Sequence, residues 1–289
     1  MEVEETKDGL TRRNFLGSTA VGVLAAGLTA GSLLSPREAH AALTFPHVAL
    51  DVEKVREYGY YWYQKGPGCG HGSARALIQG FVEACNAAGQ TATGWHELPR
   101  SLYAWSNGGG PSGWGTLCGA IAGSVGVLNL LGLHGTLGPT VFEWYVQQNF
   151  PLATLDSWSG VDAGAGTILA PIKDADVKGH SIPDSPLCHV SVSKWLAAAN
   201  SFLGEKNAAG QGLKEDRCGK VTGDTAAFTA YLLNEKLAGR NPAPWAKPAA
   251  MASCFDCHDP AGTAGVTSKT SQTKMDCLPC HTEPVSGRK

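Results

Sequence analysis

Apolar residues recur along this chain with the spacing of amphipathic helices. In a helix with about 3.6 residues per turn, apolar side chains three and four positions apart share one face. Several segments follow this pattern, and glycine, proline or other turn residues separate most of them. The expected helices cover residues 52–65, 69–82, 121–133, 139–150, 190–203 and 221–237. The sequence therefore predicts a mainly α fold.

The stretches between these helices predict where the chain is irregular and where it divides. Gly, Ala, Asp and Pro dominate residues 151–186, which favours loop. Two prolines in residues 241–245 end the last helix, and beyond them large apolar side chains are few. Such a stretch cannot form a core of its own. We expect a helical redox domain over 42–244 and a small, irregular haem-binding segment over 245–289.

The C-terminal segment holds two copies of C-x-x-C-H, at residues 254–258 and 277–281. This is the attachment signature of c-type haem, because two thiols bond to one porphyrin and the adjacent histidine binds its iron. The expected attachment residues are Cys254, Cys257, Cys277 and Cys280, and the expected axial ligands are His258 and His281. A zinc site formed by both C-x-x-C pairs is the alternative, but it leaves the two histidines without a role. The sequence predicts two haem c groups per chain, with the porphyrins supplying the apolar surface that this segment lacks.

The first 41 residues predict export through the twin-arginine route. Residues 11–17 read T-R-R-N-F-L-G, an uncharged stretch follows, and residues 39–41 form an A-x-A cleavage site. The apolar run is long enough to span a membrane, but its Gly, Ser and Thr content favours a cleaved signal over a retained anchor. We expect a periplasmic protein without a stable membrane anchor. Because this route carries folded proteins, it also favours a second cofactor that is inserted before export.

Five cysteines lie outside the haem motifs. Four of them stand at or near a predicted helix start, where free N–H groups and the helix dipole stabilise a thiolate or an anionic ligand: Cys69, Cys118, Cys188 and Cys218. They could hold an iron–sulfur cluster such as [2Fe–2S], form two disulfides, or act as a redox-active dithiol. Folded export favours the cluster. Cys85 lies late in its helix, and we expect it to be a small buried apolar residue.

These cysteines and their neighbours carry a family resemblance. The segments G-P-G-C-G at residues 66–70, G-W-G-T-L-C-G-A at 113–120 and R-C-G at 217–219, together with Cys188, resemble the C-GCAxxG-C-C group of redox proteins. Trp114 stands where that group usually has a second cysteine. With the two haem motifs appended, residues 45–281 resemble the split-Soret cytochromes c.

This resemblance implies more than the residue patterns do by themselves. It implies a mainly α-helical homodimer whose subunits each carry two closely stacked haems with two histidine ligands per iron. It also implies an iron–sulfur site in the helical domain. Since the second cysteine of the glycine-rich motif is absent, a four-cysteine cluster would need all of Cys69, Cys118, Cys188 and Cys218.

Each haem iron needs a second axial ligand if the protein is a low-potential carrier. His189 is our first candidate because it adjoins Cys188 in the segment that best matches the family. His47 is the second, because it lies in an N-terminal arm that could reach the haem of a neighbouring subunit. Further candidates are His71, His96, His134 and His180. Any of these histidines can instead be an ordinary core or surface residue.

The patterns together favour an electron carrier over an enzyme. The formal net charge of −2 gives no electrostatic reason to expect nucleic-acid binding. No Ser-His-Asp or paired-carboxylate pattern stands out. The expected partners are a second copy of the chain and redox proteins. The alternatives are a periplasmic reductase that uses the non-haem cysteines as its active site, and a sensor with an open haem.

Overall fold

The computed structural model describes residues 44–108, 113–162 and 167–242. Helices dominate this part of the chain, which confirms the mainly α expectation. They are α2 (Val52–Lys65), α3 (Cys69–Ala87), α4 (Thr93–Glu97), α5 (Gly119–Leu130), α6 (His134–Gln147), α7 (Cys188–Ala198) and α8 (Leu213–Leu237). Single 3₁₀ turns occur at η1 (Ala104–Ser106), η3 (Ala153–Leu155) and η4 (Asp174–Asp176), and β1 (Val161–Asp162) pairs antiparallel with β2 (Thr167–Ile168).

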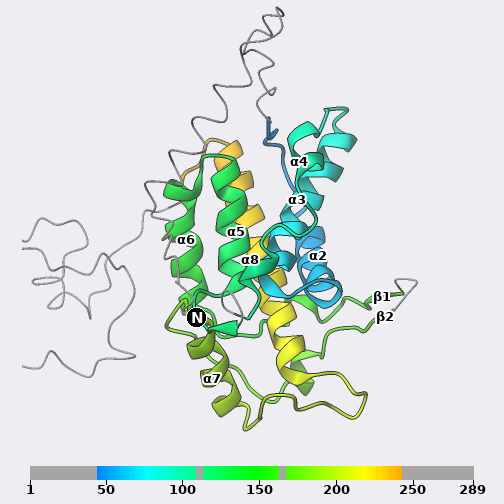
Figure 1. Cartoon of the computed structure of the whole chain (residues 1–289), viewed down its shortest axis with the longest axis vertical. Helices are drawn as coiled ribbons and strands as arrows, with labels where there is room; N and C mark the ends of the chain where they lie inside the picture. Colours follow the sequence, from blue (N-terminus) through cyan, green and yellow to red (C-terminus); the bar gives the residue numbers. More distant parts are fainter. Residues whose placement is uncertain (1–43, 109–112, 163–166, 243–289) are drawn as a thin grey trace, which may run out of the picture. The chain divides into compact units, whose positions relative to one another are not determined.

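The helix α8 organises the bundle, because it packs against α2, α3, α5 and α6 (Figure 1). Its crossing with α2 is close. A Cβ atom added to Gly59 would lie 2.5 Å from the Cα of Gly223. Only glycines allow two helix backbones to approach in this way. The other extensive contacts join α3 to α2 and α5, and α5 to α6, and α3 also contacts α4 and η1.

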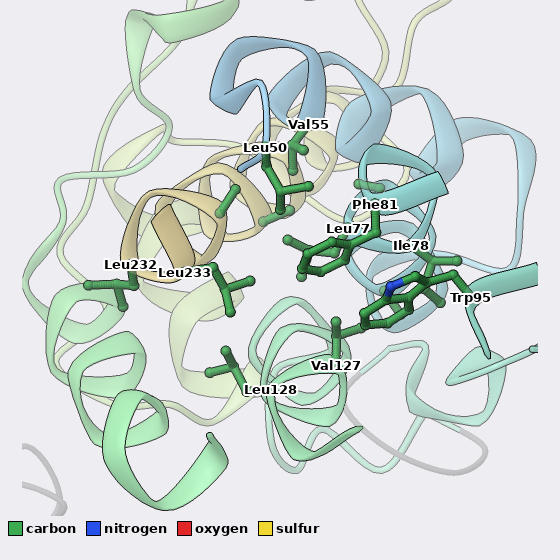
Figure 2. Packing of buried hydrophobic residues seen from close by; sticks show 14 of the residues in the cluster. Leu50, Val55, Leu77, Ile78, Phe81, Trp95, Val127, Leu128, Leu232 and Leu233 are labelled. Carbon is green, nitrogen blue, oxygen red and sulfur yellow. The ribbon is translucent and has the colours of Figure 1, made fainter. Parts of the chain in front are cut away.

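The main core lies among α3, α5 and α8 (Figure 2). Phe81 and Trp95 stack with their ring centroids 4.3 Å apart and nearly parallel planes. Around them pack fully or almost fully buried aliphatic side chains, namely Leu50, Val55, Leu77, Ile78, Val127, Leu128, Leu232 and Leu233. Burial of each such side chain contributes about 1.5–3 kcal/mol. Cys85 also lies in this core and is fully buried, as expected.

Hydrogen bonds hold the N-terminal arm against this core. The side chain of Asn234 in α8 accepts from the Leu50 N–H at 2.8 Å and donates to the Leu50 carbonyl at 2.8 Å. The Trp95 indole donates to the Pro46 carbonyl at 2.9 Å. The arm therefore enters the bundle in a fixed path before α2 begins at its N-cap Asp51.

Two predicted helix starts were wrong. The helix expected over 139–150 begins at His134 and contains Pro139 in its interior, although proline favours the first position of a helix. The helix expected over 221–237 begins at Leu213. Its first turns bury Asp216, Arg217 and Lys220. Buried charged residues interrupt the apolar pattern on which the prediction rested.

Several predicted helix ends also differ: the helix expected over 190–203 ends at Ala198, and the one expected over 69–82 continues to Ala87. The remaining expectations for the fold were met or lie outside the described residues. Within 151–186 the described chain is irregular apart from the short hairpin and two 3₁₀ turns, as expected. The export signal, residues 109–112, both haem motifs and the proposed domain boundary after residue 244 lie outside the described residues. In the part of the chain that is described, no helix has the length and apolar character needed to cross a membrane.

Candidate functional site

The four cysteines at the predicted helix starts converge in space. Cys69, Cys118, Cys188 and Cys218 line one small cavity of about 20 Å³, a volume close to that of one water molecule. Cys69 and Cys188 are the first residues of α3 and α7, and Cys118 is the N-cap of α5. Cys218 was expected just before a helix but lies inside α8, because that helix begins at Leu213.

A short strand-like pairing brings Cys118 next to Cys188. Leu117 and Leu187 form an antiparallel bridge. The Cys118 N–H donates to the Pro186 carbonyl at 2.8 Å, and the Cys188 N–H donates to the Thr116 carbonyl at 2.7 Å. Two cysteines that are 70 positions apart in the sequence are thereby fixed by backbone hydrogen bonds.

Glycines bring the start of α5 against the start of α3. A Cβ atom on Gly119 would lie 2.5 Å from the Cys69 sulfur and 2.6 Å from the Gly70 nitrogen. Gly68, with φ of 90°, turns the chain into α3 immediately before Cys69. The thiols of Cys69 and Cys118 are hydrogen-bond partners as a result.

The site stabilises negative charge unevenly. A hydrogen bond from Cys69 lowers the pKa of Cys118 to about 6, aided by Tyr145, the Ala120 N–H and the charge of Arg217, and opposed by burial. The same hydrogen bond and burial raise the pKa of Cys69 well above its usual range. Burial and the neighbouring thiols raise the pKa of Cys188 to about 12. Of these three thiols only Cys118 is favoured as a thiolate, so binding through all of them requires a cationic partner such as iron.

Three buried residues that the sequence did not single out complete the site. Tyr145, Ser191 and Arg217 line the cavity with the cysteines, and each is at most 2% exposed. Arg217 donates to the Ser191 hydroxyl at 2.7 Å, and Tyr145 and Ser191 are hydrogen-bonded at 3.0 Å. Arg217 adjoins Cys218 in the R-C-G segment, and Ser191 lies one helical turn after Cys188, whereas Tyr145 has no cysteine near it in the sequence.

The donor set can be tested against the competing roles of these cysteines. All five described cysteines are free, so no disulfide joins them in this structure. Among the described residues, no group of three or more His, Cys, Asp or Glu side chains is placed to bind a single metal ion. A cluster with several irons distributes its thiolate ligands over more than one metal centre. Four thiols around one cavity therefore fit a cluster better than one tetrahedral ion.

The two first-choice distal histidines have different surroundings. His189 is exposed, and its Nδ1 lies 2.8 Å from the Gly115 carbonyl. Histidines that bind metals commonly donate one ring N–H to a carbonyl and bind through the other nitrogen. His47 is half-buried, with Nε2 3.1 Å from the Leu233 carbonyl, and burial lowers its pKa. To bind iron through Nε2, His47 would have to break this hydrogen bond.

Of the remaining described histidines, His71 and His180 are less suited to bind a haem iron. His71 is buried edge-on to Trp62, and its Nδ1 has no hydrogen-bond partner. Nδ1 of His180 lies 2.8 Å from the Pro151 carbonyl, and its Nε2 lies 3.4 Å from Asp174. His96 and His134 are exposed.

Comparison with known proteins identifies the family. No family model matches the chain. Split-Soret cytochrome c from Desulfovibrio desulfuricans is 31% identical over 247 residues, which cover 82% of this chain and 77% of that protein. The chain belongs to the split-Soret cytochrome c family. This confirms the resemblance noted in the sequence and makes the protein a c-type cytochrome that carries electrons.

A solved structure agrees with this assignment. It describes a novel iron centre in the split-Soret cytochrome c of Desulfovibrio desulfuricans. It matches this cytochrome with a TM-score of 0.63 and 25% identity, over 85% of this chain and 93% of that chain. The described bundle is therefore the fold of a protein of the same family.

Proposed function

We propose that this cytochrome is a periplasmic carrier that moves electrons between two haems and an iron–sulfur cluster. The haems would be attached at residues 254–258 and 277–281, and the cluster would be held by Cys69, Cys118, Cys188 and Cys218. The observation that supports the cluster is the convergence of four thiols from four helices around one cavity. The iron centre described for the related protein is a second support.

The surroundings of the four thiols suit an anionic cluster. Three of the cysteines lie at helix starts, where free N–H groups and the helix dipole favour negative charge. Hydroxyl groups reach two of them, since Tyr145 is a hydrogen-bond partner of Cys118 and Tyr63 of Cys218. Thiolate-bound clusters are stabilised by such donors, which also set their reduction potentials. When bound, the cluster would supply one-electron redox chemistry.

We propose His189 as a distal haem ligand, with His47 as the second candidate. The hydrogen bond from Nδ1 to the Gly115 carbonyl orients the His189 ring and leaves Nε2 for iron. Trp114, which is 80% exposed, precedes Gly115 and offers an apolar ring beside this position. An exposed aromatic ring suits contact with a porphyrin or with the second copy of a homodimer.

A pair of glycines provides a matched test of the His189 assignment. Gly115 has φ of 71°, and a Cβ atom there would lie 2.9 Å from the Cβ of His189. Gly113 has φ of 74°, and its Cβ would meet nothing within 4 Å. Either alanine variant introduces backbone strain of about 1–2 kcal/mol, but only Gly115→Ala displaces His189.

We expect reduced Gly115→Ala to bind carbon monoxide and to lose part of its low-spin haem spectrum, as His189→Ala should. Gly113→Ala should keep the wild-type spectrum. If Gly115→Ala and His189→Ala both keep that spectrum, His189 is not a ligand.

One observation favours a second function, a thiol-based reductase. Cys69 and Cys118 line the same cavity, and a hydrogen bond from Cys69 lowers the pKa of Cys118 to about 6, so this pair is the candidate for a reversible disulfide. Closing the disulfide from the Cys69 thiol and the Cys118 thiolate would release two electrons, which the haems can accept, and one proton. Reduction of a substrate would require the reverse flow, from haems to disulfide to substrate.

The purified, haem-loaded protein distinguishes these functions. The proposed carrier should show a split Soret band, more iron than haem, and acid-labile sulfide. Cys188→Ala should lose the excess iron, whereas Cys85→Ala, which alters a cysteine in the main core, should retain it. Equal amounts of iron and haem in the wild type would exclude the cluster, and substrate-dependent reoxidation of the haems would then favour the reductase.

A further inference from the structure

Arg217 is a buried cation without a carboxylate partner. Only 2% of the residue is exposed, and none of the ion pairs among the described residues involves it. Its Nε is buried and makes no hydrogen bond. An uncompensated charge inside a protein is strongly destabilising. The fold retains this one, so the counter-charge of Arg217 has to come from another kind of group.

The groups around the guanidinium identify that counter-charge as anionic sulfur. Nη1 lies 4.0 Å from the sulfur of Cys218, and Cys69, Cys118 and Cys188 line the same cavity as Arg217. On another side the guanidinium carbon lies 5.9 Å from the centre of the Phe150 ring. The titratable groups that share this cavity with Arg217 are thus the cysteines and Tyr145. Arg217 also lines a second small cavity with Asp176 and Asp216, but neither carboxylate forms an ion pair with it.

A second path connects Arg217 to a cysteine on a different helix. Nη2 donates to the Ser191 hydroxyl at 2.7 Å, and Ser191 is hydrogen-bonded to Tyr145 at 3.0 Å. Tyr145 is in turn a hydrogen-bond partner of Cys118. Because hydroxyl hydrogens rotate to suit their partners, the chain can run from guanidinium to Ser191 to Tyr145 to sulfur, each group donating to the next. The positive charge of the guanidinium polarises each hydrogen bond in such a series.

We propose that Arg217 is the charge partner of the iron–sulfur cluster and raises its reduction potential. It acts directly at Cys218 and, through Ser191 and Tyr145, at Cys118. This inference rests on the proposed function. Reduction adds one electron, delivered from a haem, to a thiolate-bound cluster and makes it more negative. A fixed positive charge at this distance stabilises the reduced form more than the oxidised form.

Lys214 supplies a matched control for the charge. It is a second cation that interacts electrostatically with Cys218 and Cys188. Its side chain is 28% exposed, however, and its amino group lies 3.4 Å from the Glu215 carboxylate. Solvent and a carboxylate screen it. Removing its charge should therefore affect the cluster much less than removing the charge of Arg217.

The test uses full-length, haem-loaded protein with the variants Arg217→Gln, Arg217→Lys, Tyr145→Phe and Lys214→Gln. Circular dichroism reports folding, iron in excess of haem reports cluster content, and a redox titration followed by electron paramagnetic resonance gives the cluster midpoint. We expect Arg217→Gln to lower the midpoint more than Lys214→Gln does. Arg217→Lys should retain part of the wild-type value, and Tyr145→Phe should shift it less, in the same direction.

Loss of the cluster from folded Arg217→Gln but not from Arg217→Lys would also support the proposal. If both Arg217 variants lose the cluster, the midpoint of Tyr145→Phe tests the proposal instead. A wild-type midpoint in that variant would overturn the proposed effect of Arg217 through Ser191 and Tyr145. An unchanged midpoint in a cluster-loaded Arg217→Gln overturns the proposal while leaving the cluster in place. Absence of excess iron in the wild type would instead refute the proposed function itself, and the role of Arg217 with it.

Discussion

Replacing Gly223 by alanine should destabilise the protein, although alanine is the better helix former. Gly223 lies inside α8 where this helix crosses α2. A Cβ atom at this position would lie 2.5 Å from the Arg56 carbonyl oxygen. The obstructing atom belongs to the backbone, so it cannot rotate away as a side chain could. The two helices would have to separate.

The magnitude follows from two opposing terms. Alanine in a helix interior gains about 1 kcal/mol over glycine. Relieving the overlap requires a movement of about 1 Å, since atoms in contact normally lie about 3.5–4.0 Å apart, and overpacking of this kind costs about 1–3 kcal/mol. The movement also disturbs the buried ion pair between Arg56 and Asp224, the residue next to Gly223. We expect a net loss of about 1–2 kcal/mol.

Chemical denaturation of the haem-loaded protein, followed by circular dichroism, measures this difference. Gly138→Ala is the control, because Gly138 is a buried glycine inside α6 whose added Cβ would meet only Val125, at 3.6 Å. That variant should be unchanged or up to about 1 kcal/mol more stable. If Gly223→Ala is as stable as the wild type, the close approach of α2 and α8 is not required.

Three further outcomes follow from the buried residues. Burial raises the pKa of Asp224 to about 6, against the opposing effects of Thr154 and Arg56, so the folded state binds more protons than the unfolded state between about pH 4 and 6. The stability of the wild type relative to Asp224→Asn should therefore fall as the pH rises through this window, and denaturation midpoints that move the other way would contradict this. Phe81→Ala should lose about 3–5 kcal/mol, because it removes a fully buried ring that stacks on Trp95, and a loss below about 1 kcal/mol would contradict the packing. Cys85→Ala should lower stability by about 1 kcal/mol, and iron analysis that shows depletion in this variant would contradict the separation of Cys85 from the site.

Regular sequence patterns predicted the helices whose ends carry local signals. The helix α2 begins and ends where it was predicted, because Asp51 caps its start and Gly66 follows its end. The start of α8 was missed because Asp216, Arg217 and Lys220 are buried there. Their burial depends on partners such as Ile172, whose backbone accepts from Lys220 and donates to Asp216. The spacing of apolar residues along a helix does not reveal contacts with residues so distant in the sequence.

The site was predictable in its sulfur atoms and not in its surroundings. Glycine and proline before a helix marked Cys69, Cys118 and Cys188 as residues at helix starts, which the structure bears out. Tyr145 and Ser191 carry no such mark, because a tyrosine or serine in a helix has many ordinary roles. Their part in the site arises only when α6 and α7 are packed together with Arg217.

The start of α7 joins the two redox sites that we propose. Cys188 and His189 are consecutive, and their N–H groups donate to Thr116 and Gly115, at 2.7 and 3.2 Å. The same paired segments place Cys118 at the start of α5. One pair of backbone segments thus fixes two of the four thiols together with the proposed haem ligand. Under this assignment a single peptide bond separates a cluster ligand from a haem ligand, so the geometry of each site constrains that of the other.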